Sequence, residues 1–131
     1  MCIRDRDYIP VISPIAVDRE GNSLNVNADS VAAEIACAIR AEKLILLTDV
    51  AGLLRNPADP SSLISQATPT LVKELVAAGV IGGGMTPNVE ACLKAAQRGV
   101  TSHIIDGNAP HTILLELLTD KGIGTMITGS K

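Results

Sequence analysis

The chain almost lacks aromatic side chains: its 131 residues include one Tyr, no Phe and no Trp. Proteins that bind single-stranded nucleic acid stack bases on such rings, so this mode of binding is excluded. An excess of positive charge is missing as well, because the formal net charge is −3. A surface of that sign does not favour nucleic-acid phosphates or an anionic membrane. We therefore expect neither nucleic acid nor a membrane as a partner.

Long apolar runs and paired cysteines are also missing. No apolar run reaches about 18 residues, so no membrane-spanning helix is expected. The three cysteines form no CxxC pair and stand at no metal-ligand spacing from either histidine, so we expect no metal site; they are Cys2, Cys37 and Cys92. An odd count without a signal peptide is typical of reduced, intracellular thiols. Cys37 and Cys92 fall on apolar helix faces, which predicts buried structural thiols.

Aliphatic residues are what the chain has in quantity. It is 47% hydrophobic with a mean hydropathy of +0.31, which is enough for a core of Leu, Ile, Val and Ala in one domain or part of a larger one. Residues 1–7 are charged and show no pattern that continues past residue 7. We interpret them as a leader that is not native to the fold, and residues 8–131 as the domain proper.

Strand and helix patterns alternate along residues 8–131. Apolar, β-branched runs predict strands at 8–18, 43–48, 100–106 and 124–128. Helical spacing and cap signals predict four helices: 25–42 with Asn27 or Asp29 as N-cap, one between Thr68 and Gly79, one between Thr86 and Gly99, and 111–118. This order predicts an α/β fold of three layers, α/β/α, around a mainly parallel sheet. Ligands of such sheets bind beyond the carboxyl ends of the strands.

The glycine stretch GVIGGGMTPN, residues 79–88, is the first candidate site. Gly82, Gly83 and Gly84 expose backbone N–H groups ahead of a helix whose N-terminus carries positive dipole, a favourable place for an anion. The pattern matches neither GxxxxGK[ST] nor GxGxxG. A flexible turn between two helices is the alternative interpretation.

Polar residues at strand ends give further candidates. Asn25, Asn27 and Asp29 in NVNAD are either competing helix caps or polar groups aimed into a cleft. Asp49 in TDVAGLL follows a strand and is either a solvated loop acid or a ligand contact. The two histidines have no ligand cluster beside them. Buried, hydrogen-bonded imidazoles or small-ligand contacts are the interpretations we favour for them.

Read jointly, NVNAD, KLILLTDVAGLL, GGMTPNVEAC and HIIDGNAPHTILLELLTDKGIGTMITG resemble the acetylglutamate kinases of the amino acid kinase family, over residues 8–131. The resemblance covers the C-terminal, ATP-binding part of those enzymes. GGMTP and NPADPSSLI are most similar to the arginine-sensitive cyanobacterial and plant branch. The resemblance implies the C-terminal portion of the amino acid kinase fold. It also implies ATP-dependent phosphorylation of the γ-carboxylate of N-acetyl-L-glutamate in arginine biosynthesis, with Mg²⁺, in the cytoplasm or a plastid.

The resemblance also implies residue roles. Asn25 would bind acetylglutamate and Asp29 would orient two catalytic lysines. The nucleotide would contact Asp49, Val50, Ala51, Gly52, Leu53 and Leu54, with Gly82, Gly83, Gly84 and Met85 beside the ATP phosphates. Feedback arginine would contact His103, Glu116, Gly122 and Gly124; for Glu116, a helix-surface acid is the alternative, and Lys121 stands where the family often has an acid. The intact branch forms homo-oligomers and binds the PII nitrogen-signalling protein.

Two departures from the family pattern bear on catalysis. The family's first lysine and its glycine-rich substrate loop are not found in this sequence, and Asn88 stands where the second lysine is expected. An amide cannot replace an ammonium in stabilising a transferred phosphoryl group, so the chain alone is predicted to be inactive. The alternatives are a non-catalytic nucleotide- or arginine-binding regulatory module, or another amino acid kinase that acts on an acid such as aspartate or glutamate.

Overall fold

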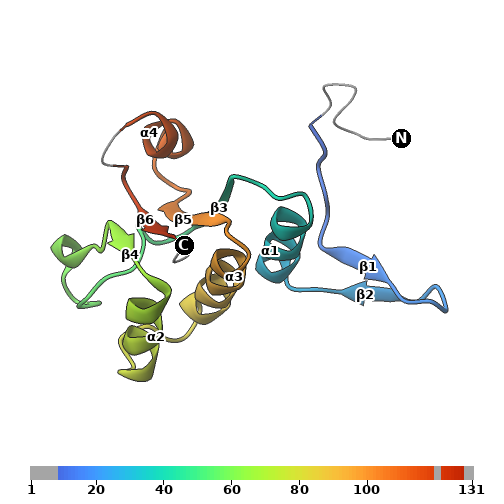
Figure 1. Cartoon of the computed structure of the whole chain (residues 1–131), viewed down its shortest axis with the longest axis horizontal. Coiled ribbons are helices and arrows are strands. Elements are labelled where there is room, and N and C mark those ends of the chain that lie inside the picture. Colours follow the sequence, from blue (N-terminus) through green and yellow to red (C-terminus); the bar gives the residue numbers. More distant parts are fainter. Residues whose placement is uncertain (1–8, 120–121, 129–131) are drawn as a thin grey trace.

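The computed structural model describes residues 9–119 and 122–128; the leader predicted for residues 1–7 lies outside this range. Figure 1 shows the elements in chain order: β1 (Ile15–Val17), β2 (Ser23–Asn25), α1 (Ala28–Ala38), β3 (Lys43–Thr48), the 3₁₀ turn η2 (Pro60–Ser62), β4 (Gln66–Ala67), α2 (Pro69–Ala77), α3 (Met85–Gln97), β5 (Thr101–Asp106), α4 (Thr112–Leu118) and β6 (Thr125–Ile127). All four predicted helices are present, in the predicted order relative to the strands.

Four of the strands form one sheet in the order β3-β5-β6-β4. β3 and β5 pair in parallel along six residues, from Lys43 opposite Thr101 to Thr48 opposite Asp106. β4 is also parallel to β6, whereas β6 runs antiparallel to β5. The sheet is therefore mixed but mostly parallel, which confirms the predicted class. β4 was not predicted, because a two-residue strand shows no periodicity.

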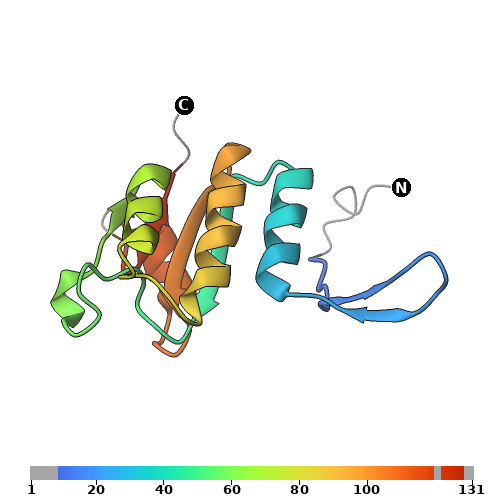
Figure 2. The same cartoon turned by 90° about the horizontal axis from the view of Figure 1, so that it is seen from below.

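The helices lie on both faces of this sheet. α1, α2 and α3 cover one face and α4 covers the other (Figures 1 and 2), which gives the predicted three layers. The two faces of β5 show the division: Ile104 belongs to the core together with Val89 and Cys92 of α3, whereas His103 contacts Glu116 of α4. Burial raises the pKa of the Cys92 thiol to about 12, as expected for a structural thiol. Cys37 is only half-buried, so that part of the prediction is wrong.

Local signals set several helix ends correctly, but α1 ends at Ala38 and not at residue 42 as predicted, because the chain turns into a left-handed conformation at Arg40, where φ is 52°. Asn27, not Asp29, caps α1, since its side chain accepts a hydrogen bond from the Ser30 N–H at 2.9 Å. Thr68 caps α2 in the same way through the Leu71 N–H, with Pro69 at the first helical position. Gly79 and Gly99 follow α2 and α3 with φ of 71° and 79°, the left-handed conformation that ends a helix.

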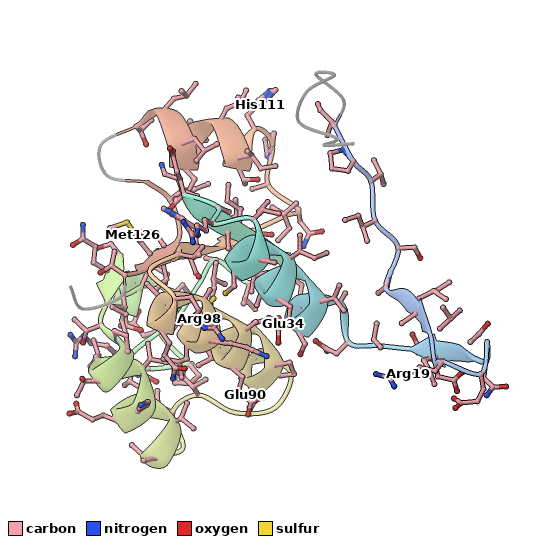
Figure 3. All side chains as sticks on the ribbon, turned by 45° about the vertical axis from the view of Figure 1, so that its right-hand side comes forward. Arg19, Glu34, Glu90, Arg98, His111 and Met126 are labelled. Carbon is pink, nitrogen blue, oxygen red and sulfur yellow. The ribbon has the colours of Figure 1, made fainter. Side chains whose placement is uncertain are left out.

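The strand predicted for residues 8–18 is mostly absent. Only Ile15–Val17 forms a strand, and it pairs antiparallel with β2 in a two-stranded hairpin outside the main sheet. Pro10 and Pro14 lack the N–H that a ladder needs, and residues 9–14 are exposed. The hairpin extends away from the helices, with Arg19 at its turn (Figure 3). Its apolar residues are exposed, as 68% for Ile15 and 69% for Val17 show.

Helix α4 has an unusual distribution of polarity. Its buried residues are Thr112 and Glu116, four positions apart and hence on one face. Its aliphatic residues are all at least 39% exposed: Ile113, Leu114, Leu115, Leu117 and Leu118. The polar stripe of this helix, not its apolar side, faces the sheet. Among the residues that the structure describes, no helix is long and apolar enough to cross a membrane.

Candidate functional site

The candidate residues gather at one edge of the sheet. α1 and α3 run side by side in the same direction, and their N-termini lie at the edge where β3 and β5 end (Figure 2). Parallel strands carry their carboxyl ends to a common edge, and helix N-termini there present positive dipole. The turn that follows β5 is tied to this edge, since the Gly107 N–H donates to the Thr48 carbonyl at 2.8 Å. This edge is where an anionic ligand is expected.

Two segments that are about thirty residues apart in sequence line a pocket of about 230 Å³ there. Six of the predicted nucleotide residues take part: Val50, Gly52, Leu53, Leu54, Gly82 and Met85. Pro57, Val80 and Ile81 complete the lining. The predicted contacts Asp49, Ala51, Gly83 and Gly84 are not among the lining residues. Pro57 carried no sequence signal, because it lies in a loop that only the fold brings back to this edge.

The glycine loop before α3, residues 82–84, has open space around its Cα atoms. A Cβ added at Gly82, Gly83 or Gly84 would meet no atom within 4 Å, so packing inside the described chain does not require these glycines. The Met85 and Thr86 N–H groups donate to the carbonyls of Gly82 and Gly83, both at 3.3 Å. The N–H groups of Gly83 and Gly84 have no partner among the described residues. Two amides thus remain for a ligand.

The start of α3 differs from the prediction. Gly84 occupies the N-cap position and makes no side-chain cap, and the helix begins at Met85. Thr86 is therefore inside the first turn instead of capping it. The turn bonds between the glycine carbonyls and the next two amides wind the chain into helical geometry earlier than the Thr-Pro signal indicates.

Asn88 and Asp29 lie in the first turns of the neighbouring helices α3 and α1. Both side chains are half-buried. The Asn88 amide donates to the Met85 sulfur at 3.6 Å, a weak bond that any polar ligand would outcompete. Asn25 ends β2 opposite Ile15 and is exposed. None of the three lines the 230 Å³ pocket.

A second polar site lies on the opposite face of the sheet. His103 Nδ1 and Glu116 Oε1 are 2.6 Å apart, and both side chains are about 95% buried. The other carboxylate oxygen, Oε2, accepts from the Ile123 N–H at 2.7 Å and the Gly124 N–H at 3.1 Å. Glu116 is therefore an internal carboxylate, which rules out the alternative of a helix-surface acid. His103 confirms the expectation of a buried, hydrogen-bonded imidazole, although its Nε2 has no partner in the described chain.

The two glycines predicted to contact arginine frame this carboxylate. Gly122 has φ of 59°, and a Cβ there would lie 2.6 Å from Glu116 Oε2. A Cβ at Gly124 would collide with the Ile104 carbonyl. A pocket of about 160 Å³ borders the group, lined by Lys43, Ser65, Gln66, His103, Glu116, Leu117, Thr119, Gly122 and Met126. Sequence reasoning missed Lys43, although the parallel register of β3 and β5 places it beside Thr101. His111 is exposed, at the N-terminal end of α4 (Figure 3), so the interpretation of this residue as a buried imidazole is wrong.

Lowering the pH is expected to destabilise the chain through Glu116. Desolvation raises its pKa, but the hydrogen bonds from His103 and two backbone amides outweigh this effect, so the pKa lies below the ordinary value of 4.5. The stabilisation is therefore complete above that ordinary value and is lost as pH falls through the folded-state pKa. Urea unfolding between about pH 6 and about pH 3 should show a larger loss for the native chain than for Glu116→Gln. Equal losses of stability in the two proteins would contradict the assignment of this pH dependence to Glu116.

No metal-binding cluster accompanies these two sites. Among residues 9–119 and 122–128, no group of three or more His, Cys, Asp or Glu side chains is placed to hold an ion.

Comparisons with known proteins fit this geometry. The sequence model of the Amino acid kinase family matches residues 2–106. The acetylglutamate kinases of Methanothrix thermoacetophila and Synechococcus elongatus are 60% and 55% identical over 98% and 96% of this chain. The chain spans only 45% and 42% of their lengths. Identity is higher to the Methanothrix sequence, so it does not by itself support the cyanobacterial and plant branch.

Solved structures share the fold. The N-acetylglutamate synthase of Neisseria gonorrhoeae, in complex with coenzyme A and L-arginine, has a TM-score of 0.79 at 27% identity; the match covers 89% of this chain and 27% of that one. A carbamate kinase from Giardia lamblia bound to AMP-PNP has a TM-score of 0.67 at 20% identity, over 88% of this chain and 37% of that one. At that level of identity the second match supports the fold alone.

Proposed function

Because the chain belongs to the amino acid kinase family, we propose that it carries the nucleotide-side part of an acetylglutamate kinase. The reaction is transfer of the γ-phosphoryl group of ATP to the γ-carboxylate of N-acetyl-L-glutamate, a step of arginine biosynthesis. One observation supports this most: Val50 and Gly52–Leu54 line a single pocket with residues 80–82 and Met85, beyond the end of β3 and beside the N-terminus of α3. Relatives at 53–60% identity bear the same activity in their names.

The mainly apolar lining of the pocket fits the base and ribose of ATP, because apolar walls with a few polar groups are typical of nucleotide sites. The phosphates would then reach the free N–H groups of Gly83 and Gly84 at the start of α3. Mg²⁺ would arrive on the phosphates, since it prefers few protein ligands and retains water. Asp49 and Ala51 flank the lining residues and would contact the nucleotide at its rim.

The acceptor side is less complete in this chain. Asn25 would bind the acetylglutamate and Asp29 would orient charged partners, both from the edge at which the nucleotide binds. With Asn88 in place of a lysine, no ammonium of α3 would stabilise the charge that develops on the γ-phosphoryl group. The chain by itself is therefore a nucleotide-binding part with little or no phosphoryl transfer.

A second candidate function is arginine binding at the His103–Glu116 site. The pocket there is lined by Glu116 and His103, the Nε2 of His103 is buried without a partner in the described chain, and a structural relative was solved with L-arginine. A guanidinium would have to share a carboxylate that already accepts three hydrogen bonds. Arginine would regulate the kinase rather than take part in transfer. Homo-oligomers and binding of the PII nitrogen-signalling protein in the cytoplasm or a plastid belong to the same proposal.

Calorimetric titration with Mg·ATP tests the nucleotide site. The native chain should bind, and Gly82→Leu should weaken binding about tenfold or more, because the new side chain fills the pocket mouth. Gln97→Leu adds the same side chain at an exposed position at the far end of α3 and should leave affinity within about twofold. Absence of binding by the native chain, or equal affinities of all three proteins, would refute the proposal.

A further inference from the structure

Thr125 joins β6 to a segment, Leu53 to Ile64, that lies 61 to 72 residues earlier in the sequence. Its side chain is fully buried at the first position of β6. The hydroxyl accepts from the Leu53 N–H at 2.8 Å and donates to the Ile64 carbonyl at 2.6 Å. The Ile64 N–H in turn donates to the Leu53 carbonyl at 2.8 Å. These bonds close a ring of Leu53, Thr125 and Ile64, so both polar groups of the Leu53 backbone are fixed.

The backbone is shaped to permit this contact. Gly52 has φ of 148°, and a Cβ there would lie only 2.5 Å from the Thr125 hydroxyl oxygen. A side chain at position 52 would therefore push the segment off Thr125. Gly52, Leu53 and Leu54 are a wall of the 230 Å³ pocket. The Thr125 hydroxyl thus fixes the position of the Gly52–Leu54 wall. Thr125 itself does not line the pocket, so it leaves the space for a ligand free.

The position of Thr125 is set in turn by Glu116. The residue before Thr125 is Gly124, whose N–H donates to the Glu116 carboxylate together with that of Ile123. On the other side, the Met126 N–H donates to the Ser65 carbonyl at 2.9 Å. Ser65, Met126 and Glu116 all line the 160 Å³ pocket. The two pockets therefore share one hydrogen-bonded support, whose centre is Thr125.

We propose that Thr125 is a positioning residue for the nucleotide pocket and that the Glu116 carboxylate fixes its place, so that the two pockets are coupled. The part that concerns nucleotide rests on the proposed function. Any ligand that pulls Glu116 away from the Ile123 and Gly124 amides loosens Thr125, and with it the Leu53 wall. By linkage, nucleotide bound against Leu53 changes the affinity of the second pocket by the same factor.

Amide hydrogen exchange of the full chain tests the support itself. Thr125→Val removes the hydroxyl at nearly constant shape, and exchange at Leu53 should rise about tenfold or more because its N–H loses its acceptor. Thr125→Ser keeps the hydroxyl and should restore native exchange. Glu116→Gln should raise exchange at residues 122–125 and also at Leu53. Glu34→Gln, which breaks the exposed ion pair between Glu34 and Lys94, should leave Leu53 unchanged.

Mg·ATP titrations of the same variants test positioning: affinity should fall about tenfold in Thr125→Val and return in Thr125→Ser. Equal Leu53 exchange in Thr125→Val and Thr125→Ser would overturn the proposal. If Thr125→Val does not fold, Glu116→Gln decides, since faster exchange at 122–125 without a change at Leu53 would refute the coupling. A native chain that binds no ATP would refute the proposed function. The exchange results would still test whether Thr125 and Glu116 fix the position of Leu53.

Discussion

Asn88→Lys is expected to raise phosphoryl transfer about 10²–10³-fold once the remaining part of the enzyme is supplied. Asn88 lies in the first turn of α3, after the glycine loop in which the N–H groups of Gly83 and Gly84 have no partner among the described residues. Its amide carries no charge and bonds only weakly to the Met85 sulfur. A lysine there adds an ammonium with a longer reach, and such a charge stabilises the transition state of phosphoryl transfer more than the ground state.

The measurement uses a chimera, because this chain spans only 45% of the length of its Methanothrix relative. Residues 8–131 replace the matching region of that enzyme, and ADP formation is followed with ATP and N-acetyl-L-glutamate. Gln97→Lys adds the same charge at the exposed far end of α3 and should have no effect on the rate. If Asn88→Lys gives no increase, the assignment of this position is wrong. If the 131-residue chain alone turns over as fast as the intact relative, the predicted loss of activity is wrong.

Gly124→Ala is expected to lower the free energy of unfolding by about 3 kcal/mol. The added Cβ would collide with the backbone carbonyl of Ile104 and lie 2.5 Å from a methyl carbon of Ile105. Neither atom is at the end of a flexible side chain that can turn away, so the strand pair β5–β6 must separate. A domain of this size has about 5–15 kcal/mol in total, and a substantial fraction of its stability would be lost.

Gly82→Ala is the matched control for this substitution. Gly82 has no positive φ, and its Cβ would meet nothing within 4 Å, so its effect should stay within about 0.5 kcal/mol. Urea unfolding followed by circular dichroism measures both variants. Equal stabilities would show that β6 relaxes around a side chain at position 124. A large loss for Gly124→Ala alone would mean that this glycine is required for packing, whether or not arginine binds beside it.

Local chemistry made the helices and the central strand predictable. Thr68 and Gly79 bracket α2 because a hydroxyl cap and a left-handed glycine act within a few residues of their own position. The apolar run at 43–48 became β3 with the predicted bounds. The resemblance to the acetylglutamate kinases, and not local chemistry, grouped residues 49–54 with 82–85, and the structure brings six of these ten predicted nucleotide contacts into one pocket.

Features that depend on distant partners were not predictable from the sequence. The short β1 and β4 owe their bounds to the strands they pair with. Thr125 looked like any strand threonine, because its two hydrogen-bond partners lie 72 and 61 residues away. Glu116 was left open as a surface acid, since an acid among leucines normally marks the solvent side of a helix. Here His103 of β5 and the amides of Ile123 and Gly124, just before β6, bond to Glu116 and turn this face of α4 toward the sheet.

The outer edge of β3 allows a further strand to join the sheet. Among the described residues, β3 pairs with β5 alone, so one row of its backbone groups is open to a further strand. A polypeptide that joins there extends the hydrogen-bonded ladder and leaves the packing of α1 and α3 on the sheet as it is. The relatives, more than twice as long as this chain, have ample residues for such an addition. The hydrogen bonds at Leu53 and at Glu116 have partners on β5, β6 and the loops beside them and none on β3, so growth at β3 would leave these bonds in place.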